Sequence, residues 1–473
     1  MNETASLCAQ LDACGQSHLA LAMESHPTIG DCLAKVDWNA IPSLVERYVR
    51  RRPVAASGDL QPAACVSTNP ASAGGSITLL DADLLRKRGE ALLAAGRVAV
   101  FTVAGGQGTR LGWKGPKGTF PASPVMGKPL FRLFAEQILA AEKRWECRIR
   151  WFIMTSEVND AATRSFFLDN RCFGLDRRQI MMFPQGMMPA FEAKSGCVLM
   201  DSPTSLAMSP DGHGGSYGAL LRCGALDQME GRGIDMISYH QVDNPIAPIL
   251  DPVFLGLHAD TDHSSGEFTS KMVFKSSPDE KVGVFAIRGG VPGVVEYSDM
   301  TESQATETDE DGRLKFSAGN LAMHIISTDF ARRVAMAGEE ALPWHRADKK
   351  VPCIDPETAE RITPSEPNAV KLERFVFDAM PVAKQSAILE VDRAAEFAPI
   401  KNATGTDSAE SSRQLQSDLY GSWLEAAGVA VPRRDGGHVD AMIEISPLTA
   451  MSAADLSATA LPDHVEPGSS VIL

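Results

Sequence analysis

The sequence predicts an α/β protein with a mixed, mostly parallel central sheet, an N-terminal helical region and a small C-terminal domain. Between Val98 and about Ile400, apolar segments alternate with helical ones, which is typical of a sheet covered on both faces. Residues 1–95 show helical patterns, whereas glycine and small residues punctuate short segments after Lys401. Since 473 residues exceed a single core, we expect three parts: 1–96, 97–400 and 401–473.

The individual elements follow from apolar spacing and turn residues. Helices are expected over Glu3–Leu21, Ile41–Arg51, Asp81–Ala95, Phe131–Lys143 and Ser216–Met229. Strands are expected over Val98–Val103, Arg148–Thr155, Gln179–Phe183, Met236–Val242, Lys271–Phe274, Val282–Ile287 and Met323–Ser327. Two polar stretches, Ala55–Gly75 and the acidic Asp299–Arg313, are expected to be loops.

Composition excludes several classes of protein. Acidic residues outnumber basic ones by 60 to 45, a formal charge of −15, which disfavours general nucleic-acid binding but permits a local cationic pocket. No apolar run approaches the roughly 18 residues of a membrane span. Nine scattered cysteines without a C-x-x-C pair indicate reduced thiols, and no basic and apolar leader begins the sequence. We expect a cytoplasmic protein, monomeric or homodimeric.

A glycine-rich loop follows the first expected strand of the sheet. Residues 103–118 read Val-Ala-Gly-Gly-Gln-Gly-Thr-Arg-Leu-Gly-Trp-Lys-Gly-Pro-Lys-Gly. A strand that runs into such a turn delivers backbone N–H groups to a phosphate chain, and glycine lets the ligand approach the backbone. Arg110 and Lys117 add cations for the same phosphates. The loop therefore predicts a phosphate-binding site.

Two better-known phosphate loops do not fit this stretch. In Gly106-Gln-Gly108-Thr-Arg-Leu-Gly112 the last glycine comes one residue too late for G-x-G-x-x-G, and the acidic residue expected about 20 positions further on is missing. The P-loop requires Gly-Lys-Ser or Gly-Lys-Thr, and neither occurs. A dinucleotide-dependent dehydrogenase is therefore disfavoured.

A second motif is expected to face the same crevice. Gln241-Val-Asp-Asn244 follows the strand expected over Met236–Val242, and ligands of α/β sheets bind beyond the carboxyl ends of the strands. The Asp243 carboxylate is a hard oxygen ligand, so it is the leading candidate to bind Mg²⁺, although it could instead cap a turn. Asp251 is an alternative ligand, but Asp-Pro at this position favours the start of a turn.

The glycine-rich loop resembles a known family. Gly105-Gly-Gln-Gly-Thr-Arg-Leu followed by Pro116-Lys-Gly is similar to the signature of the UDP-sugar pyrophosphorylases, in particular the eukaryotic-type UDP-N-acetylhexosamine pyrophosphorylases. Further blocks resemble the family in the same order: Phe183–Ala190, Ser209–Gly215, Gln241–Asn244, Gly293–Tyr297, Ser317–Asn320, Lys371–Asp378 and Phe397–Ala403. The resemblance implies a Rossmann-like nucleotidyltransferase that converts UTP and N-acetylglucosamine-1-phosphate to UDP-N-acetylglucosamine and pyrophosphate, with Mg²⁺ as cofactor.

The resemblance also implies roles for individual residues. Arg110, Lys117 and Lys401 would act on the reacting phosphates, and Asp243 would hold the metal. The nucleotide would be bound by Val103, Ala104, Gly105, Gly106, Lys117, Gln185, Gly212, Asp243 and Lys371. Gln185 would contact the uracil edge, and Gly212 and Gly215, just before a helix start, would offer free N–H groups. The sugar would be bound by His213, Glu296, Tyr297, Asn320 and Lys401. We expect His324 to be a packed strand residue.

Three departures from the family pattern concern the sugar. His213 stands where the family commonly has an asparagine, and an imidazole is bulkier and can titrate near neutrality. Ser317 and Met323 replace two further asparagines. A UDP-glucose or broad-specificity pyrophosphorylase therefore remains an alternative. So does a non-catalytic nucleotide-sugar sensor, which the intact cations disfavour.

Overall fold

The structure, a computed structural model, describes residues 3–51, 59–72, 77–310 and 312–473. The chain forms two compact units that interleave along the sequence. Unit 1 comprises Met1–Gly58, Gln185–Gly218 and Ala337–Asp378, and unit 2 comprises Asp59–Pro184, Ala219–Met336 and Ala379–Leu473. The division at residues 96 and 400 stays a prediction.

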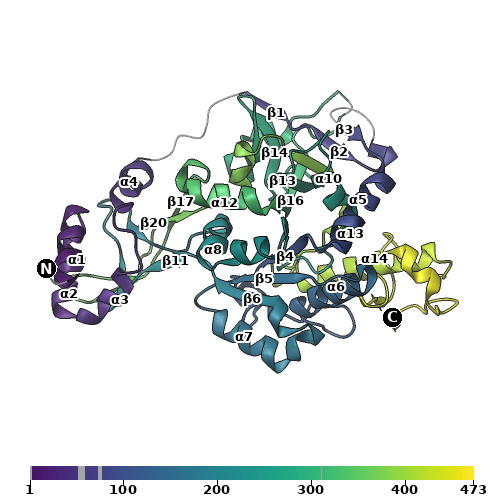
Figure 1. Ribbon diagram of the computed structural model, residues 1–473, viewed down its shortest axis with the longest axis horizontal. Coiled ribbons are helices and arrows are strands. Elements are labelled where there is room, and N and C mark those ends of the chain that lie inside the picture. Colours follow the sequence, from purple (N-terminus) through teal and green to yellow (C-terminus); the bar gives the residue numbers. More distant parts are fainter. Residues whose placement is uncertain (1–2, 52–58, 73–76, 311) are drawn as a thin grey trace. The chain divides into compact units, whose positions relative to one another are not determined.

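Unit 2 is built on a mixed sheet that has 12 strands in the described part of the chain. The main path runs β3-β2-β21-β13-β16-β12-β4-β5-β6, and β14 pairs with β1, β15 and β16. Along this path the pairs are parallel except at β16, which runs antiparallel to β12 and β13. Figure 1 shows β4, β5 and β6 side by side. The predicted fold class is confirmed.

Seven of the twelve described strands in this sheet overlap the expected ones, whereas β1, β2, β3, β15 and β21 were not predicted. Their bounds are β1 Leu60–Pro62, β2 Cys65–Ser67, β3 Ile77–Leu79, β4 Val98–Val103, β5 Arg150–Thr155, β6 Ile180–Pro184, β12 Met236–Gln241, β13 Phe268–Phe274, β14 Val284–Arg288, β15 Val291–Val295, β16 Ala318–Ser327 and β21 Ala387–Glu390. The prediction of a loop over Ala55–Gly75 is wrong where β1 and β2 form, because short strands in polar sequence draw their stability from their neighbours. Residues 55–58 and 73–75 lie outside the described residues.

The helices of unit 2 include those that cover the sheet and α14, which ends at Ala426. They are α5 Ala82–Ala94, α6 Leu130–Trp145, α7 Asp160–Asp169, α9 Ala225–Glu230, α10 Pro252–His258, α11 Glu302–Thr306, α12 Thr328–Ala337, α13 Arg393–Glu396 and α14 Ala409–Ala426. The strands β22 Met442–Glu444 and β23 Ser470–Ile472 form a separate pair. After Lys401 only short segments were expected, and this prediction is wrong for the 18-residue helix α14. Ser408 caps this helix, and Leu419, Tyr420 and Leu424 lie on its buried face. The acidic loop Asp299–Arg313 contains α11, which buries no side chain.

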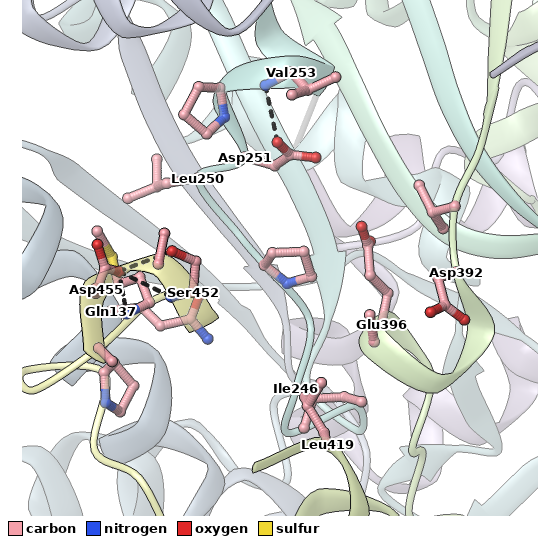
Figure 2. Close-up of a pocket in the computed structure, with 18 of the residues that line it drawn as sticks. Gln137, Ile246, Leu250, Asp251, Val253, Asp392, Glu396, Leu419, Ser452 and Asp455 are labelled. Atoms are coloured by element: carbon pink, nitrogen blue, oxygen red, sulfur yellow. Dashed lines mark hydrogen bonds between the residues drawn. The ribbon is translucent and has the colours of Figure 1, made fainter. Parts of the chain in front are cut away.

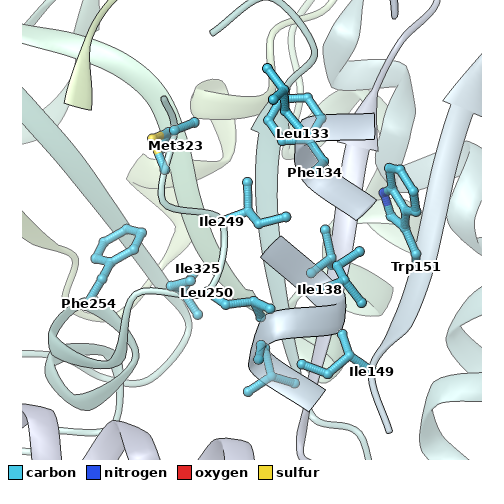
Figure 3. Packing of buried hydrophobic residues seen from close by; sticks show 14 of the residues in the cluster. Leu133, Phe134, Ile138, Ile149, Trp151, Ile249, Leu250, Phe254, Met323 and Ile325 are labelled. Carbon is cyan, nitrogen blue, oxygen red and sulfur yellow. The ribbon is translucent and has the colours of Figure 1, made fainter. Parts of the chain in front are cut away.

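One hydrophobic cluster holds α6 and α10 against the sheet. Figure 3 shows Leu133, Phe134 and Ile138 of α6 facing Trp151 of β5 and the turn that contains Ile249. The buried residues of α6 include Leu130, Phe134, Ile138 and Ala141, which are three to four positions apart and form one face of the helix. The Trp151 indole donates to Thr102 Oγ1 at 2.8 Å, which links β5 to β4 inside the core. This packing holds α6, β4 and β5 together.

Unit 1 combines short helices with small antiparallel sheets. Its elements are α1 Glu3–Ala13, α2 Ser17–Ser25, α3 Gly30–Leu33, α4 Ile41–Leu44, β7 Met187–Pro189, β8 Phe191–Glu192, β9 Met200–Ser202, β10 Ser205–Leu206, β11 Met208–Pro210, β17 His345–Lys349, β18 Cys353–Ile354, β19 Arg361–Ile362 and β20 Ala369–Glu373. The single helix expected over Glu3–Leu21 is wrong, since Gly15 adopts φ +71° between α1 and α2. The chain passes from unit 1 to unit 2 within α8, Ser216–Arg222, and Gly224 at φ +73° separates α8 from α9.

Candidate active site

The glycine-rich loop after β4 is closed by its own backbone. Gly108 N–H donates to Gly115 O at 2.9 Å, and Lys117 N–H donates to Gly106 O at 3.1 Å. The buried Asn159 holds the start of the loop through Nδ2, which donates to Ala104 O at 2.9 Å and to Gly106 O at 3.2 Å. Within the described chain, the N–H groups of Gly105 and Gly106 have no acceptor. Fixed, unused donors of this kind suit a phosphate group.

Glycine is required in this loop for different reasons at different positions. A Cβ at Gly108 would lie 2.7 Å from the Trp113 side chain, and one at Gly118 would lie 2.2 Å from the Phe131 ring. Packing therefore requires these two glycines. A Cβ at Gly106 would meet only Lys117 Cδ at 4.0 Å, so the space in front of Gly106 is open. A ligand that approaches the backbone would account for glycine at this position.

Asp243 and Lys117 form an ion pair at the ends of two neighbouring strands. β4 and β12 are parallel partners, and Lys117 Nζ lies 3.2 Å from Asp243 Oδ2. Burial alone would raise the pKa of Asp243, but the charges of Lys117 and Lys401 and the hydrogen bond from Lys117 lower it below its usual range. Asp243 is therefore ionised at neutral pH. The structure thus brings the two predicted motifs into one site.

Lys401 and Arg110 supply further positive charge in unit 2. The Lys401 side chain is 43% exposed, and its ammonium lies 3.9 Å from Asp407 Oδ2 and 5.3 Å from the centre of the Phe397 ring. Arg110 is exposed in a short helical turn of the loop, and no carboxylate in the described part of the chain pairs with it. Both cations are free to meet an anionic ligand.

The predicted sugar residues of unit 2 lie on β15, β16 and the turns beside them. Glu296 and Tyr297 follow β15, and Tyr297 is 47% exposed. Asn320 is partly buried in β16, where its Oδ1 accepts from the Ala322 N–H at 2.9 Å. Met323 is buried in the hydrophobic core. The expectation that this departure affects sugar binding stays a prediction.

Besides His213, four predicted site residues belong to unit 1. Gln185 is buried directly after β6, and the partly buried Lys371 lies in β20 opposite Ala347 of β17. Gly212 adopts φ +83°, and a Cβ there would lie 2.4 Å from Arg374 O. The expected free N–H of Gly215 is wrong, since this group donates to Gly212 O at 3.0 Å. Here the glycines serve packing.

His213 is a neutral residue of an aromatic cluster in unit 1. Its ring stacks on Phe375 with centroids 5.3 Å apart, and Nδ1 accepts from the Val376 N–H at 3.1 Å. Burial, together with the charge of His345, lowers the pKa of His213 to about 4. The expectation that this histidine titrates near neutrality is therefore wrong. Since Nδ1 is an acceptor, Nε2 carries the proton and can donate.

One cavity in unit 2 is separate from the glycine loop. This cavity has a volume of about 920 Å³ and a mostly apolar lining, to which none of residues 103–119 contributes. Figure 2 shows Ile246, Leu419, Asp251 and Glu396 around it. Asp251 accepts from the Val253 N–H at 2.9 Å and so caps α10, which confirms the expected turn.

A magnesium site made by protein ligands alone is not found. In the described ranges no three His, Cys, Asp or Glu side chains gather as a metal site. Mg²⁺ is usually held by one or two carboxylates together with substrate phosphates and water. The single ionised carboxylate of Asp243, beside the open glycine loop, fits that pattern.

Sequence reasoning did not identify the polar side chains that hold the site in place. Asn159, Asn244 and the fully buried Lys271 lie in or after strands of the sheet. Asn159 could have been found by the rule applied to Asp243, because it follows β5, the neighbour of β4. No local sequence pattern marks Lys271, because its partners Asp251 and Glu396 are distant in sequence. His324 is fully buried and bonded to Ser270, as expected for a packed strand residue.

The described structure combines a mixed α/β sheet with an open glycine loop, and it places cations around a carboxylate at the ends of adjoining strands. This combination is typical of a nucleotide-binding enzyme. Residues 67–421 match the family model described as UTP–glucose-1-phosphate uridylyltransferase. This match covers more than half of the chain. The chain belongs to that family, and the family resemblance seen in the sequence is confirmed.

Individual relatives agree with this assignment. The UDP-N-acetylglucosamine pyrophosphorylase of Saccharomyces cerevisiae is 38% identical over 77% of this chain and 76% of the yeast protein. The UDP-N-acetylhexosamine pyrophosphorylase-like protein 1 of Homo sapiens is 35% identical over 95% of this chain and 93% of its own length. A crystal structure of the uridine diphosphate N-acetylglucosamine pyrophosphorylase from Trypanosoma brucei superposes with a TM-score of 0.81 at 24% identity, over 100% of this chain and 98% of that one. This last likeness concerns the fold.

Proposed function

We propose that this chain transfers the uridylyl group of UTP to N-acetylglucosamine-1-phosphate, which yields UDP-N-acetylglucosamine and pyrophosphate. The observation that carries the proposal is the ion pair of Lys117 with Asp243, 3.2 Å apart at the ends of β4 and β12. The open backbone at Gly106 beside Lys117 supports it. Family membership and the names of the relatives support the choice of substrates.

The proposed reaction needs charge and alignment more than proton transfer. A phosphate oxygen of the sugar phosphate attacks the α-phosphorus of UTP, and the bond from that phosphorus to the departing pyrophosphate breaks. The attacking oxygen is already anionic, so no general base is required. Two polyanions must approach each other, and Lys117, Lys401 and Arg110 offset their repulsion. The N–H groups of Gly105 and Gly106 are free to donate to phosphate oxygens.

Magnesium is part of this proposal. Asp243 would hold Mg²⁺ together with phosphate oxygens of the nucleotide. When bound, the ion would neutralise charge on the reacting phosphates. Lys117 would then hold its position between Asp243 and the loop, because its Nζ can donate to both the carboxylate and a phosphate.

The other binding roles stay proposals as well. Gln185 and the backbone of Val103 and Ala104 would bind the uridine. Gly212 and Lys371 would also contact the nucleotide. Glu296, Tyr297, Asn320 and Lys401 would bind the sugar phosphate, and His213 would donate from Nε2 to an oxygen acceptor of the sugar.

We propose a reducing, cytoplasmic setting and a monomer or homodimer. All nine cysteines are free thiols, which agrees with such a compartment. No described helix is both long and apolar enough to cross a membrane.

Pyrophosphate release tests the proposed function directly. The full chain is mixed with UTP, Mg²⁺ and, in separate reactions, glucose-, N-acetylglucosamine-, N-acetylgalactosamine- or galactose-1-phosphate. We expect a strong preference for the N-acetylated sugars. Preference for glucose- or galactose-1-phosphate would instead assign a UDP-glucose or broad-specificity enzyme. If no sugar phosphate leads to pyrophosphate release although UTP binds, the protein would be a nucleotide-sugar sensor.

A further inference from the structure

Asn244 connects two chain segments that carry site residues. It follows Asp243 in the turn after β12 and is 7% exposed. Its Nδ2 donates to Glu396 O at 2.6 Å, and its Oδ1 accepts from the Ala398 N–H at 3.1 Å. Both ends of one carboxamide are therefore used on the segment that leads to Lys401.

Further hydrogen bonds hold the same segment. The Ile400 N–H, directly before Lys401, donates to Asp243 O at 2.9 Å. Ser412 Oγ of α14 donates to Ala398 O at 2.6 Å from another side. The backbone of residues 396–401 is thus fixed to the turn that carries Asp243.

These hydrogen bonds lie close to a cavity in unit 2. The turn after Asn244, represented by Pro245 and Ile246, borders the cavity of about 920 Å³, and so do Ala395 and Glu396. Ile246 and Ala398 also belong to one hydrophobic cluster. A buried ion triad joins the two segments further along: Lys271 Nζ lies 2.6 Å from Asp251 Oδ2 and 2.7 Å from Glu396 Oε2.

The Lys401 ammonium has few contacts. The side chain is 43% exposed, the nearest carboxylate oxygen, on Asp407, is 3.9 Å from Nζ, and the Phe397 ring centre is 5.3 Å from it. A long, exposed side chain keeps many rotamers, so its average position depends on where the backbone is anchored. Asn244 provides two of the anchoring hydrogen bonds.

We propose that Asn244 is a positioning residue: its carboxamide holds residues 396–401 against the turn after β12 and so keeps the Lys401 ammonium beside the Asp243 carboxylate. The inference rests on the proposed function, because this arrangement matters for phosphates that bind between the two groups. Asn244 itself touches no reacting atom in this scheme. It acts through Lys401.

Hydrogen exchange tests the anchoring without any substrate. Asn244→Ala in the full chain removes both hydrogen bonds, and we expect amides of the 396–401 segment to exchange at least tenfold faster, since about 1.4 kcal/mol of local stability corresponds to tenfold. Asn170→Ala is the matched control, because its Nδ2 donates to one backbone carbonyl, Phe166 O, at the end of α7. Unchanged exchange in N244A, or equal effects in both variants, would overturn the proposal.

A double-mutant cycle tests the connection to Lys401. We expect N244A to lower kcat/KM by about 10²-fold, mainly through kcat, since small misplacement of a reacting group has effects of this size. In a Lys401→Ala background the same substitution should add almost nothing. An equal loss in both backgrounds, or a loss confined to KM, would contradict the proposed role.

The two measurements separate the inference from the function on which it rests. If the wild-type protein releases no pyrophosphate, the proposed function fails, while the exchange result still decides whether Asn244 anchors the segment. If N244A does not fold, Asn244→Asp serves in both measurements. It keeps the side-chain size and the bond to Ala398 but places an oxygen against Glu396 O.

Discussion

Two glycine-rich loops of this protein look alike in sequence and differ in structure. In the loop after β4, the N–H groups of Gly105 and Gly106 have no acceptor within the described chain, and the space at Gly106 is open. In the loop before α8, Gly214 N–H donates to Arg374 O, and Gly212 is required by the close approach of the same carbonyl. The first loop leaves its donors for a ligand, whereas the second uses them in its own packing.

The difference shows that glycine content alone does not identify a phosphate site. What separates the loops is whether packing already explains each glycine and whether the backbone donors are already used. The cations follow the same division. Lys117 pairs with Asp243 beside the open loop, whereas His213 in the closed loop is neutral. Each of the following predictions would sharpen or break this contrast.

The largest effect is expected at the cation of the open loop. Lys117→Met removes the charge but keeps an unbranched side chain, and we expect kcat/KM for pyrophosphate release to fall by about 10²- to 10³-fold, the usual loss for one charge-stabilising group. Steady-state kinetics with UTP and the preferred sugar phosphate measure it. Lys114→Met, an exposed lysine of the same loop, is the control and should stay within about twofold of wild type. Similar losses of kcat/KM in both variants would mean that any positive charge in the loop has this effect and that the position of Lys117 is unimportant.

The next effect is expected at the closed loop and concerns stability. Gly212→Ala places a Cβ 2.4 Å from Arg374 O at φ +83°, so we expect the free energy of unfolding to fall by about 2–4 kcal/mol. Urea denaturation measures this change. Gly15→Ala in the same unit has φ +71° but meets no atom within 4 Å, so it reports the backbone strain alone, about 1 kcal/mol. Equal losses in the two variants would show that the contact with Arg374 is unimportant.

How much of this site the sequence predicted depends on the range of the contacts. The meeting of Lys117 and Asp243 was predictable, because both follow neighbouring parallel strands. The bonds from Asn244 to Glu396 and Ala398 join residues more than 150 positions apart, and local patterns do not encode such pairs. Helix α14 was missed because serine and glycine obscure its apolar spacing. The burial of Met323 could not be predicted, because a family block does not tell which strand residues face the core.

A smaller effect is expected at the open glycine. Gly106 has no positive φ, and an added Cβ would meet only Lys117 Cδ at 4.0 Å, so Gly106→Ala should leave the thermal midpoint unchanged. If UTP approaches the backbone here, the same methyl group should weaken UTP binding by about tenfold, or about 1.4 kcal/mol. Calorimetric titration with UTP measures the affinity. An unchanged Kd would show that the ligand does not approach this loop and would remove the contrast between the two loops.

The smallest effect is expected from His213 and depends on pH. Its pKa is lowered to about 4 by burial and by His345, so the folded state binds fewer protons than the unfolded state as pH falls below about 6.5. The protein should therefore lose stability between about pH 6.5 and 4, and this histidine should account for about 1 kcal/mol, because its side chain keeps some contact with water, which screens the charge. His213→Asn should flatten that part of the urea-derived stability profile, whereas the exposed His26→Asn is the control for a surface histidine. Because His213 is already neutral above pH 6, the shape of the kcat/KM profile between pH 6 and 8 should be the same in H213N. A change in the shape of the kcat/KM profile in H213N would show that His213 titrates in this pH range and affects the reaction.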